Sequence, residues 1–394
     1  MSQRLRIVAV FTIALALVGG LAAANAQGRI KIGEELEYKL ATPAAYPLGG
    51  SDRPVTWSDT VFSPGATFLR IHFSKLNLPD GDYLTVSSPD GSEFWTYTAK
   101  GINGTGEFWS FSVEGDTAIV ELHSGSWLKG RTARYGLQID RIAHGTAPIN
   151  EDGSFADKVI CGTDGKEAAA CHTEVNTRPV ARLTIQSGGS SFLCTGSLVA
   201  GSNNSTLMTN NHCVANQTEA STVQARFNFQ TTTCGGTTQA TTSTFAGGTF
   251  LRTSSVNGGL DYTLLTLQGN PEATFGEYTA TTKQPTAGLN LNFPQHPAGR
   301  LKEIAFWKDS AHTLRCNVTS GNVTVSGAAS GSQVTYSCDT EGGSSGSPVL
   351  DAGTGRTIAL HHFGGISSNP CLNSATQMRQ ICADAGSLLS CATN

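Results

Sequence analysis

The sequence has few charged residues and no excess of basic ones. Only 14% of its 394 residues are Asp, Glu, Lys or Arg, whereas an average soluble domain carries about 25%. The formal net charge is −4, so the chain lacks the positive field that attracts the phosphate backbone of DNA or RNA. These absences exclude nucleic acid as a partner.

Long hydrophobic runs are also missing after the first twenty residues. The early run, residues 7–18, follows Arg4 and Arg6 and is shorter than the roughly 20 residues that span a bilayer. Ala24-Asn25-Ala26 then shows the small-x-small pattern that signal peptidase requires. We therefore predict that residues 1–26 are a cleaved signal peptide and that the protein is secreted to the extracellular space without a membrane anchor.

Cysteine is absent from the first 160 residues. All ten cysteines lie between Cys161 and Cys391, and an even number in an exported chain favours disulfide bonds. No C-x-x-C or H-x-x-x-H pair offers the spacing of a zinc site, so we expect no bound metal, and no motif calls for a cofactor. The change in cysteine content marks a domain boundary.

The cysteine-free part has the pattern of short antiparallel strands. Polar and apolar residues alternate in 67–73 and 117–122, and Pro79-Asp80-Gly81-Asp82 carries the residue types of a turn. This spacing predicts a β-sandwich over residues 27–145, followed by a linker at 146–158.

The remaining residues, 159–394, are also β in character. Thr, Ser, Gly and Val are abundant there, and the periodicity of amphipathic helices is nearly absent. Only residues 378–389 are predicted to be helical. The fold class is therefore expected to be mainly β.

Three short motifs follow one another in this second part. His212 stands directly before Cys213, Asp261 opens an apolar strand, and Ser345 lies in the run Gly342–Val349. The order His, Asp, Ser is one of those in which unrelated folds build the same catalytic triad. Each feature alone is common in loops and turns. Their coincidence in an exported, cross-linked β domain favours catalysis.

Catalysis needs these residue types together. A serine hydroxyl is a weak nucleophile at neutral pH, so the imidazole of His212 must take the proton of Ser345 as the new bond forms. The carboxylate of Asp261 would hold that imidazole in the required tautomer and orientation. Glycines beside the serine allow the backbone amides of Gly343 and Ser345 to face the developing oxyanion.

Around these motifs the chain resembles the chymotrypsin-like serine endopeptidases, which place the active site between two six-stranded β-barrels. It is most similar to the secreted lysyl and glutamyl endopeptidases, over about residues 160–385. The resemblance implies a double β-barrel protease domain at 159–394, behind a sandwich that serves as a pro-region or accessory module. It also implies a monomer that acts on polypeptide substrates. The segments that carry the resemblance are 194–198, 212–213, 261–265, 296–297, 343–348 and 361–365.

The resemblance further implies five disulfide bonds, each worth about 2–4 kcal/mol. The bridge nearest to His212 would brace the segment that holds it. The implied pairs are Cys161–Cys371, Cys171–Cys234 and Cys194–Cys213, with Cys316–Cys338 and Cys382–Cys391 as the remaining two.

One position departs from the pattern of trypsin-like zymogens. In those proteins a new N-terminal amine pairs with an Asp directly before the nucleophile, but that position is Ser344 here. We therefore expect a zymogen that is activated by removal of a covering or folding-assisting domain rather than by insertion of an amine. The bond between Lys158 and Val159 is a candidate site for that cut.

Two sets of residues point to different specificities. Asp339 stands six residues before Ser345, where trypsin carries the Asp that selects basic side chains. However, the Asp that lysyl endopeptidases use corresponds to Thr376, and Thr340 and His362 match positions that glutamyl endopeptidases use for an acidic side chain. We favour cleavage after a basic residue, and an acidic or a different preference stays open.

Two other functions are compatible with the sequence. A catalytically silent protease-like protein would use the fold for binding, adhesion or inhibition, although it has no need of an intact His212, Asp261 and Ser345. Alternatively, an active protease would keep the sandwich as a targeting module. The leading interpretation is a secreted serine endopeptidase that acts through an acyl-enzyme.

Overall fold

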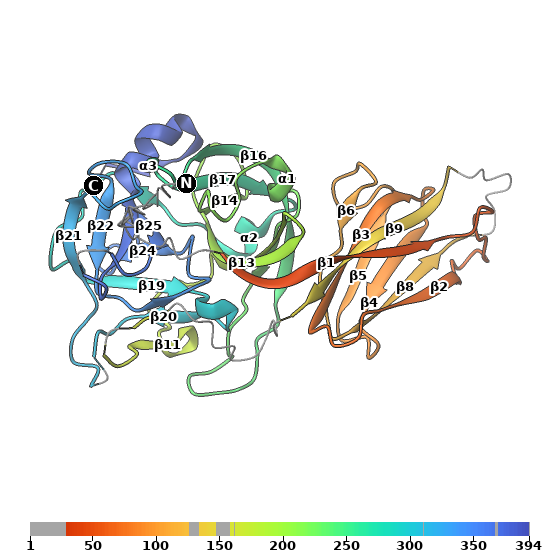
Figure 1. Cartoon of the computed structure of the whole chain (residues 1–394), viewed down its shortest axis with the longest axis horizontal. Helices are drawn as coiled ribbons and strands as arrows, with labels where there is room; N and C mark the ends of the chain where they lie inside the picture. Colours follow the sequence, from red (N-terminus) through yellow and green to blue (C-terminus); the bar gives the residue numbers. More distant parts are fainter. Residues whose placement is uncertain are drawn as a thin grey trace, which may run out of the picture.

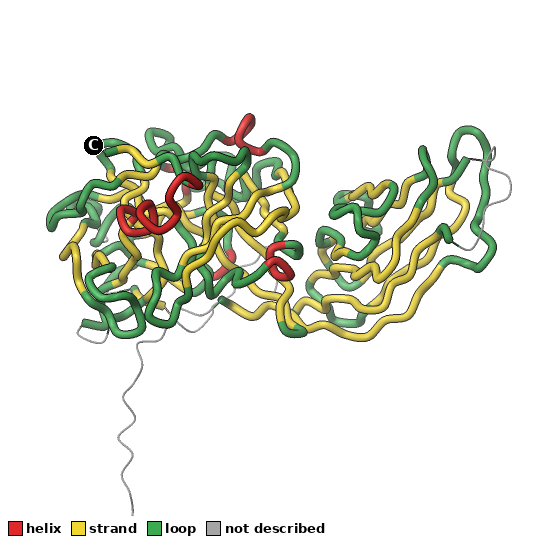
Figure 2. The backbone as a smooth tube through the Cα atoms, turned by 90° about the horizontal axis from the view of Figure 1, so that it is seen from above, coloured by secondary structure: helices red, strands yellow, loops and turns green. Residues whose placement is uncertain are grey.

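The computed structural model describes residues 29–125, 134–146, 158–160, 162–309, 311–366 and 369–393. The predicted signal peptide and most of the predicted linker lie outside this part of the chain. The described residues form two lobes, a smaller one made by the N-terminal residues and a larger one made by the rest (Figures 1 and 2). Strands dominate both lobes, so the fold is mainly β, as predicted.

The N-terminal lobe is the β-sandwich that the alternating pattern predicted. One sheet has the order β1 (Ile30–Ala41), β9 (Gly136–Gly145), β3 (Phe68–Asn77) and β6 (Phe108–Trp109), and β7 (Val113–Glu114) also pairs with β3. The other sheet has the order β2 (Val55–Phe62), β8 (Thr117–His123), β4 (Tyr83–Ser87) and β5 (Phe94–Thr98). Alternate residues of β8 point inward, so Ala118, Val120 and Leu122 are fully buried. They share one core with Leu69 and Phe73 of the facing sheet.

The larger lobe begins with a closed barrel of six strands. The strands follow the order β12 (Val180–Ser187), β15 (Gln224–Phe227), β16 (Ser243–Ser254), β17 (Tyr262–Leu267), β14 (Thr206–Thr209) and β13 (Ser190–Leu198), and β12 also pairs with β13 to complete the ring. Its interior is filled by apolar side chains such as Leu183, Phe227 and Leu265. Two short helices, α1 (Gln217–Ala220) and α2 (Pro271–Phe275), contribute Ala220 and Phe275 to the same core.

The second barrel closes less regularly. Six strands follow the order β19 (Leu291–Gln295), β24 (Pro348–Asp351), β25 (Thr357–Phe363), β26 (Asn373–Gln377), β22 (Gln333–Tyr336) and β21 (Val318–Val323). A single bridge between Asn290 and Asn317 links the residues that precede β19 and β21. The other short elements are β10 (Lys158–Val159), β11 (Lys166–Ala168), η1 (Ala169–Cys171), β18 (Ala280–Thr281), η2 (Pro297–Gly299), β20 (Glu303–Ala305), β23 (Thr340–Glu341) and β27 (Cys391–Ala392).

The one predicted helix is present near the C-terminal end. It comprises α3 (Met378–Ala385) and the 3-10 turn η3 (Gly386–Leu388). Buried residues recur at helical spacing along α3, namely Met378, Ile381, Cys382 and Ala385, which is the stripe that a helix needs to pack on a sheet. Within the described ranges, no helix combines the length and apolar content required to cross a membrane.

Disulfide bonds tie together segments of the larger lobe. The described bridges join Cys171 to Cys234, Cys194 to Cys213, Cys316 to Cys338 and Cys382 to Cys391. These are four of the pairs that the resemblance implied. Cys371 is disulfide-bonded as well, and its expected partner, Cys161, lies outside the described residues.

The two lobes share one continuous sheet. Strand β1 pairs with β9 in the sandwich and with β13 in the first barrel (Figure 1). Polar contacts support this junction: the guanidinium of Arg70 is buried and donates to the carbonyl oxygen of Thr222 at 3.1 Å. The side chain of Gln224 accepts from the amide of Ser112 and donates to its hydroxyl, both at 2.8 Å. The sandwich is therefore docked through specific buried contacts.

Replacing Gln224 by alanine should lower the free energy of unfolding by about 1–3 kcal/mol, because two buried polar groups of Ser112 lose their partner. Urea unfolding of the full-length chain, followed by tryptophan fluorescence, measures this loss. The control, Gln239→Ala, truncates an exposed glutamine and should change stability by less than about 0.5 kcal/mol. Equal stability of the Gln224→Ala and wild-type chains would contradict the expected coupling of the lobes.

Candidate active site

The first predicted catalytic residue lies in a tight turn after β14. The backbone amides of Cys213 and Val214 both donate to the carbonyl oxygen of Asn210, at 3.2 and 3.1 Å. Asn210 is fully buried, and its side-chain amide donates to the carbonyl oxygen of Asp261 at 2.8 Å. These bonds present His212 from a rigid turn, with only 10% of its side chain exposed.

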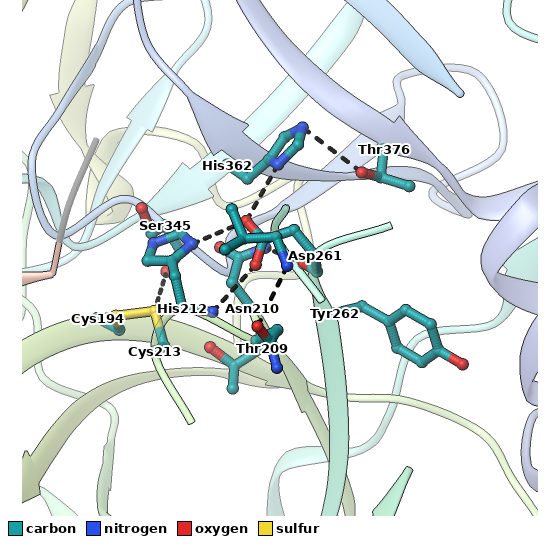
Figure 3. Close-up of polar contacts among 12 residues, drawn as sticks. Cys194, Thr209, Asn210, His212, Cys213, Asp261, Tyr262, Ser345, His362 and Thr376 are labelled. Atoms are coloured by element: carbon teal, nitrogen blue, oxygen red, sulfur yellow. Dashed lines mark hydrogen bonds and ion pairs between the residues drawn. A yellow bond between two sulfur atoms is a disulfide. The ribbon is translucent and has the colours of Figure 1, made fainter. Parts of the chain in front are cut away.

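Asp261 lies immediately before β17 in a left-handed backbone conformation. Its φ is 48°, a region that residues other than glycine seldom adopt. Its buried carboxylate accepts from the backbone amide of His212 at 3.0 Å, and its Oδ2 lies 2.7 Å from the Nδ1 of His212 (Figure 3). A carboxylate at Nδ1 requires the proton there, so Nε2 is left as an acceptor. That Nε2 is buried and has no hydrogen-bond partner among the described residues.

A second imidazole contacts the same carboxylate. The Nδ1 of His362, on β25, lies 3.1 Å from the Oδ2 of Asp261 (Figure 3). Burial alone would raise the pKa of Asp261, but the charges and hydrogen bonds of His212 and His362 outweigh it and hold that pKa well below its usual value. Asp261 therefore remains an anion, able to stabilise a positive imidazole.

His362, which the sequence analysis names as a substrate-binding residue, contacts protein groups through both ring nitrogens. Its Nε2 lies 2.6 Å from the side-chain oxygen of Gln333, so both ring nitrogens are committed to protein groups, and the side chain is fully buried. Burial also lowers the pKa of His362, which disfavours the charged form that would attract an acidic substrate. Its contact with Asp261 spans 101 residues of sequence, so no local pattern could reveal it.

Ser345 lies on a sharp turn between β23 and β24. Gly343 and Gly346 flank it with φ values of 87° and 89°. A Cβ atom on Gly346 would stand 2.0 Å from the carbonyl oxygen of Thr195, so only glycine fits there. The carbonyl oxygen of Ser345 accepts a hydrogen bond from the amide of Thr195 at 2.8 Å. Figure 3 shows Ser345 beside the imidazole of His212.

The Cys194–Cys213 bridge joins β13 to the segment that holds the histidine. The Sγ of Cys213 lies 4.0 Å from the carbonyl oxygen of Ser345. Although Cys194, Cys213 and His212 are close enough to surround a metal ion, the two sulfurs are bonded to each other and therefore offer no thiolate ligand. The bridge serves as a brace.

The peptide groups before Ser345 are held in a defined orientation. The carbonyl oxygen of Gly342 accepts from the amide of Ala298 at 2.7 Å, and that of Gly343 accepts from the hydroxyl of Thr195 at 2.8 Å. Because carbonyl and N–H point in opposite directions across a trans peptide, the amide of Gly343 faces away from Ala298. The bond from Ala298 therefore fixes the orientation of the Gly343 amide.

A buried glutamine that the sequence analysis did not identify holds this loop. The side chain of Gln295, the last residue of β19, donates to the carbonyl oxygen of Asp339 at 2.9 Å and accepts from the hydroxyl of Ser344 at 2.5 Å. It thus ties together the two ends of the segment 339–344. Its partners lie 44 and 49 residues away in the sequence, so only the folded chain shows its role.

The remaining predicted pocket residues have other partners. The Oδ2 of Asp339 accepts from the backbone amide of Gly165 at 2.8 Å, and Asp339 is 5% exposed. Thr340 is fully buried in β23, which pairs with Val159 of β10. The structure thus gives Asp339 a partner in Gly165, pairs the strand of Thr340 with β10, and places His362 against Asp261 and Gln333.

The residue after Thr340, Glu341, belongs to a buried network of charges. One carboxylate oxygen of Glu341 lies 3.1 Å from the Nζ of Lys166 and 2.7 Å from a guanidinium nitrogen of Arg300, and the side chains of Glu341 and Lys166 are almost completely buried. Burial opposes ionisation, but Arg300 and Lys166 lower the pKa of Glu341 to about 2. The network fixes the start of the loop that leads to Ser345.

Comparison with known proteins gives one family match and several relatives. Residues 149–379 match the family described as lysyl endopeptidase, C-terminal domain. A relative named secreted RxLR effector protein 73, from Plasmopara viticola, is 31% identical over 322 residues, which cover 78% of this chain and 77% of that protein. The lysyl endopeptidase of Pseudomonas aeruginosa is 27% identical over 321 residues, which cover 77% of this chain and 65% of that protein, slightly less than two thirds of its length.

Solved structures of serine proteases also align with the chain. A Glu endopeptidase in complex with MPD aligns with a TM-score of 0.40 at 20% identity, over 57% of this chain and 96% of that one. The thermostable serine protease AL20 aligns with a TM-score of 0.37 at 14% identity, over 51% and 92% of the two chains. Since the family match spans more than half of the sequence, the chain belongs to the lysyl endopeptidase C-terminal domain family.

Proposed function

We propose that this protein is a secreted serine endopeptidase that hydrolyses peptide bonds through an acyl-enzyme on Ser345. The observation that carries the proposal is the pairing of Asp261 with both the amide and the Nδ1 of His212. This pairing leaves Nε2 as the acceptor beside the serine. Membership in a family of proteases supports the same conclusion.

The geometry suits a stepwise acyl transfer. The Oγ of Ser345 attacks the carbonyl carbon of the scissile bond while the Nε2 of His212 takes the hydroxyl proton. The amides of Gly343 and Ser345 stabilise the oxyanion of the tetrahedral intermediate. His212 then gives its proton to the leaving amine, and the C–N bond breaks. A water molecule, deprotonated by His212, attacks the resulting ester and releases the acid and free Ser345.

The preferred residue before the scissile bond is proposed to be basic. The match to a family described as lysyl endopeptidase supports this preference. The carboxylate of Asp339 supports it as well, because it is buried six residues before Ser345, where a negative charge attracts a cationic side chain. The commitment of His362 to Asp261 and Gln333 removes one of the two signals that favoured an acidic substrate.

The protein is further proposed to be made as a zymogen. Residues 1–26 would be removed as a signal peptide and the sandwich, residues 27–145, as a pro-region after a cut near Lys158. Insertion of a new amine is unnecessary, because Gln295 already positions Ser344 and the loop beside it. Activation would therefore consist of uncovering a formed site.

Changing Ser345 to alanine should reduce kcat/KM for peptide substrates by at least about a thousandfold, because loss of a triad member usually costs several orders of magnitude. The assay incubates the secreted protein with a peptide library and reads cleavage sites by mass spectrometry. Cleavage after Lys or Arg is expected.

Ser347→Ala is the matched control, since it also removes a serine hydroxyl, from an equally buried position two residues after Ser345. It should keep activity within a fewfold of wild type. Equal cleavage by the Ser345→Ala and wild-type proteins would refute the proposal. No cleavage by the wild-type protein, even after a cut near Lys158 and release of the sandwich, would favour the catalytically silent alternative.

Gln295→Leu should lower kcat by about 10- to 100-fold with little change in KM. The leucine keeps the volume but releases the hydroxyl of Ser344 and the carbonyl oxygen of Asp339, so the oxyanion donors lose their fixed positions. Binding of a peptide aldehyde, which forms a tetrahedral adduct, should weaken in parallel with kcat. A purely structural role would lower thermal stability and leave the affinity for the aldehyde unchanged.

His362→Leu should lower kcat/KM about tenfold, because Asp261 loses one of two imidazole donors, whereas His362→Asn keeps a side-chain N–H and should recover most of the activity.

The pH dependence of stability gives a second readout for the same variants. The lowered pKa of Asp261 means that its stabilising contribution is complete above about pH 4 and is lost as the pH falls further. The leucine variant, with a less depressed pKa at Asp261, should therefore lose less stability than wild type between about pH 4 and pH 2. Identical activities and identical pH profiles of the three proteins would contradict this role.

A further inference from the structure

Strand β1 starts beside β13 before it enters the sandwich (Figure 1). Ile30 pairs with Leu193 and Lys31 pairs with Phe192 on β13, and the next residue of β13 is Cys194, which is bridged to the turn of His212. We propose that residues 29–34 occupy the part of the catalytic cleft that receives the polypeptide after the scissile bond, and that they block substrates from within the same chain. The inference rests on the proposed endopeptidase function.

Arg29 anchors the strand to the histidine side of the cleft. Its guanidinium donates to the carbonyl oxygen of Cys213 at 3.2 Å, to a carboxylate oxygen of Glu219 at 3.1 Å and to the hydroxyl of Ser187 at 2.9 Å. It also lies 4.3 Å from the ring centroid of Phe192, within cation–π range. These four groups form a site for a basic side chain, and one of them, the carbonyl oxygen of Cys213, belongs to the residue next to His212.

Ile30 closes the cleft from the opposite side. A Cβ atom on Gly342 would stand 3.0 Å from two side-chain carbons of Ile30, so the isoleucine packs directly on the loop that carries the oxyanion donor Gly343. Consecutive residues of β1 therefore contact both walls of the cleft. A substrate segment cannot pair with Leu193 while Ile30 does so.

The direction of β1 matches that of a bound leaving segment. Pairing proceeds from Ile30 at Leu193 to Glu34 at Ser190. From its N-terminal end, β1 therefore runs away from Cys194 and the catalytic loops, antiparallel to β13. The leaving part of a substrate, which begins at the scissile bond, has to run the same way. After the predicted signal-peptide cut behind Ala26, only two residues would precede Arg29. The strand β1 would then lie in the cleft as the new N-terminal end of a cleaved polypeptide does.

The covalent connection makes this occupant hard to displace. A segment tethered beside its site competes at an effective concentration in the millimolar range, and here a docked domain also holds the far end of the strand, through contacts such as those of Gln224 with Ser112. A cut in the linker alone leaves these contacts in place. Activity then requires the sandwich and β1 to leave.

The test compares full-length chains that mass spectrometry shows to be uncleaved. Arg29→Glu opposes Glu219, and Ile30→Asp places a charge against Gly342. Initial rates are measured on a peptide that extends five residues beyond a Lys or Arg cleavage site. Each variant should raise kcat/KM at least tenfold over wild type. The control, Leu36→Asp, adds a charge at an exposed position of β1 (42% exposed) and should leave the rate within twofold.

Thermal unfolding verifies that each variant is folded, and Arg29→Ala, with the same expected direction, replaces any variant that is not. If the variants and the uncleaved wild-type chain all cleave the peptide at the same rate, the inference is overturned and the proposed function stays intact. If adding Ser345→Ala to these variants does not lower their cleavage rate, the proposed endopeptidase function is refuted instead.

Discussion

Strand β13 is the element on which the candidate site and its cover both depend. Within three consecutive residues it pairs Leu193 with β1, binds Cys194 to the histidine turn, and uses Thr195 to hold the serine turn. The hydroxyl of Thr195 also donates to Gly343 and accepts from the amide of His296. A shift of this strand would therefore move the turns that carry Ser345 and His212 and the loop of Gly343 together.

Burial of charge is a second constraint on the site. The carboxylates of Asp261 and Glu341 are removed from water, at a cost that only close partners can offset. Asp261 has two imidazoles, and Glu341 has Lys166 and Arg300. Hydrogen bonds from Gln295 then hold the segment between Glu341 and Ser345. The combination gives the nucleophile loop a fixed shape without an ion pair to a new N-terminus.

Much of this arrangement could be predicted from local sequence. Period-two alternation marks the strands of the sandwich because one face of each sheet is buried, and the motifs around His212, Asp261 and Ser345 are short enough to read directly. The contacts of Gln295, Asp339 and His362 could not be predicted in this way. Each depends on a partner at least 29 residues away in sequence, and a glutamine, an aspartate or a histidine looks the same locally whether it faces a substrate or the protein itself.

The proposed function and the proposed cover together imply control by occupancy rather than by rearrangement. In a zymogen whose oxyanion loop is misfolded, every substrate is excluded until the loop reorganises. Here the carbonyl of Gly342 is already turned toward Ala298, so the proposed barrier to substrates is the strand whose Arg29 and Ile30 contact Cys213 and Gly342. Dissociation of the sandwich then sets the rate of activation. Because its docking surface includes buried, hydrogen-bonded groups such as Ser112 and Gln224, that dissociation is expected to be slow, and conditions that weaken the docking would speed activation without touching the catalytic residues.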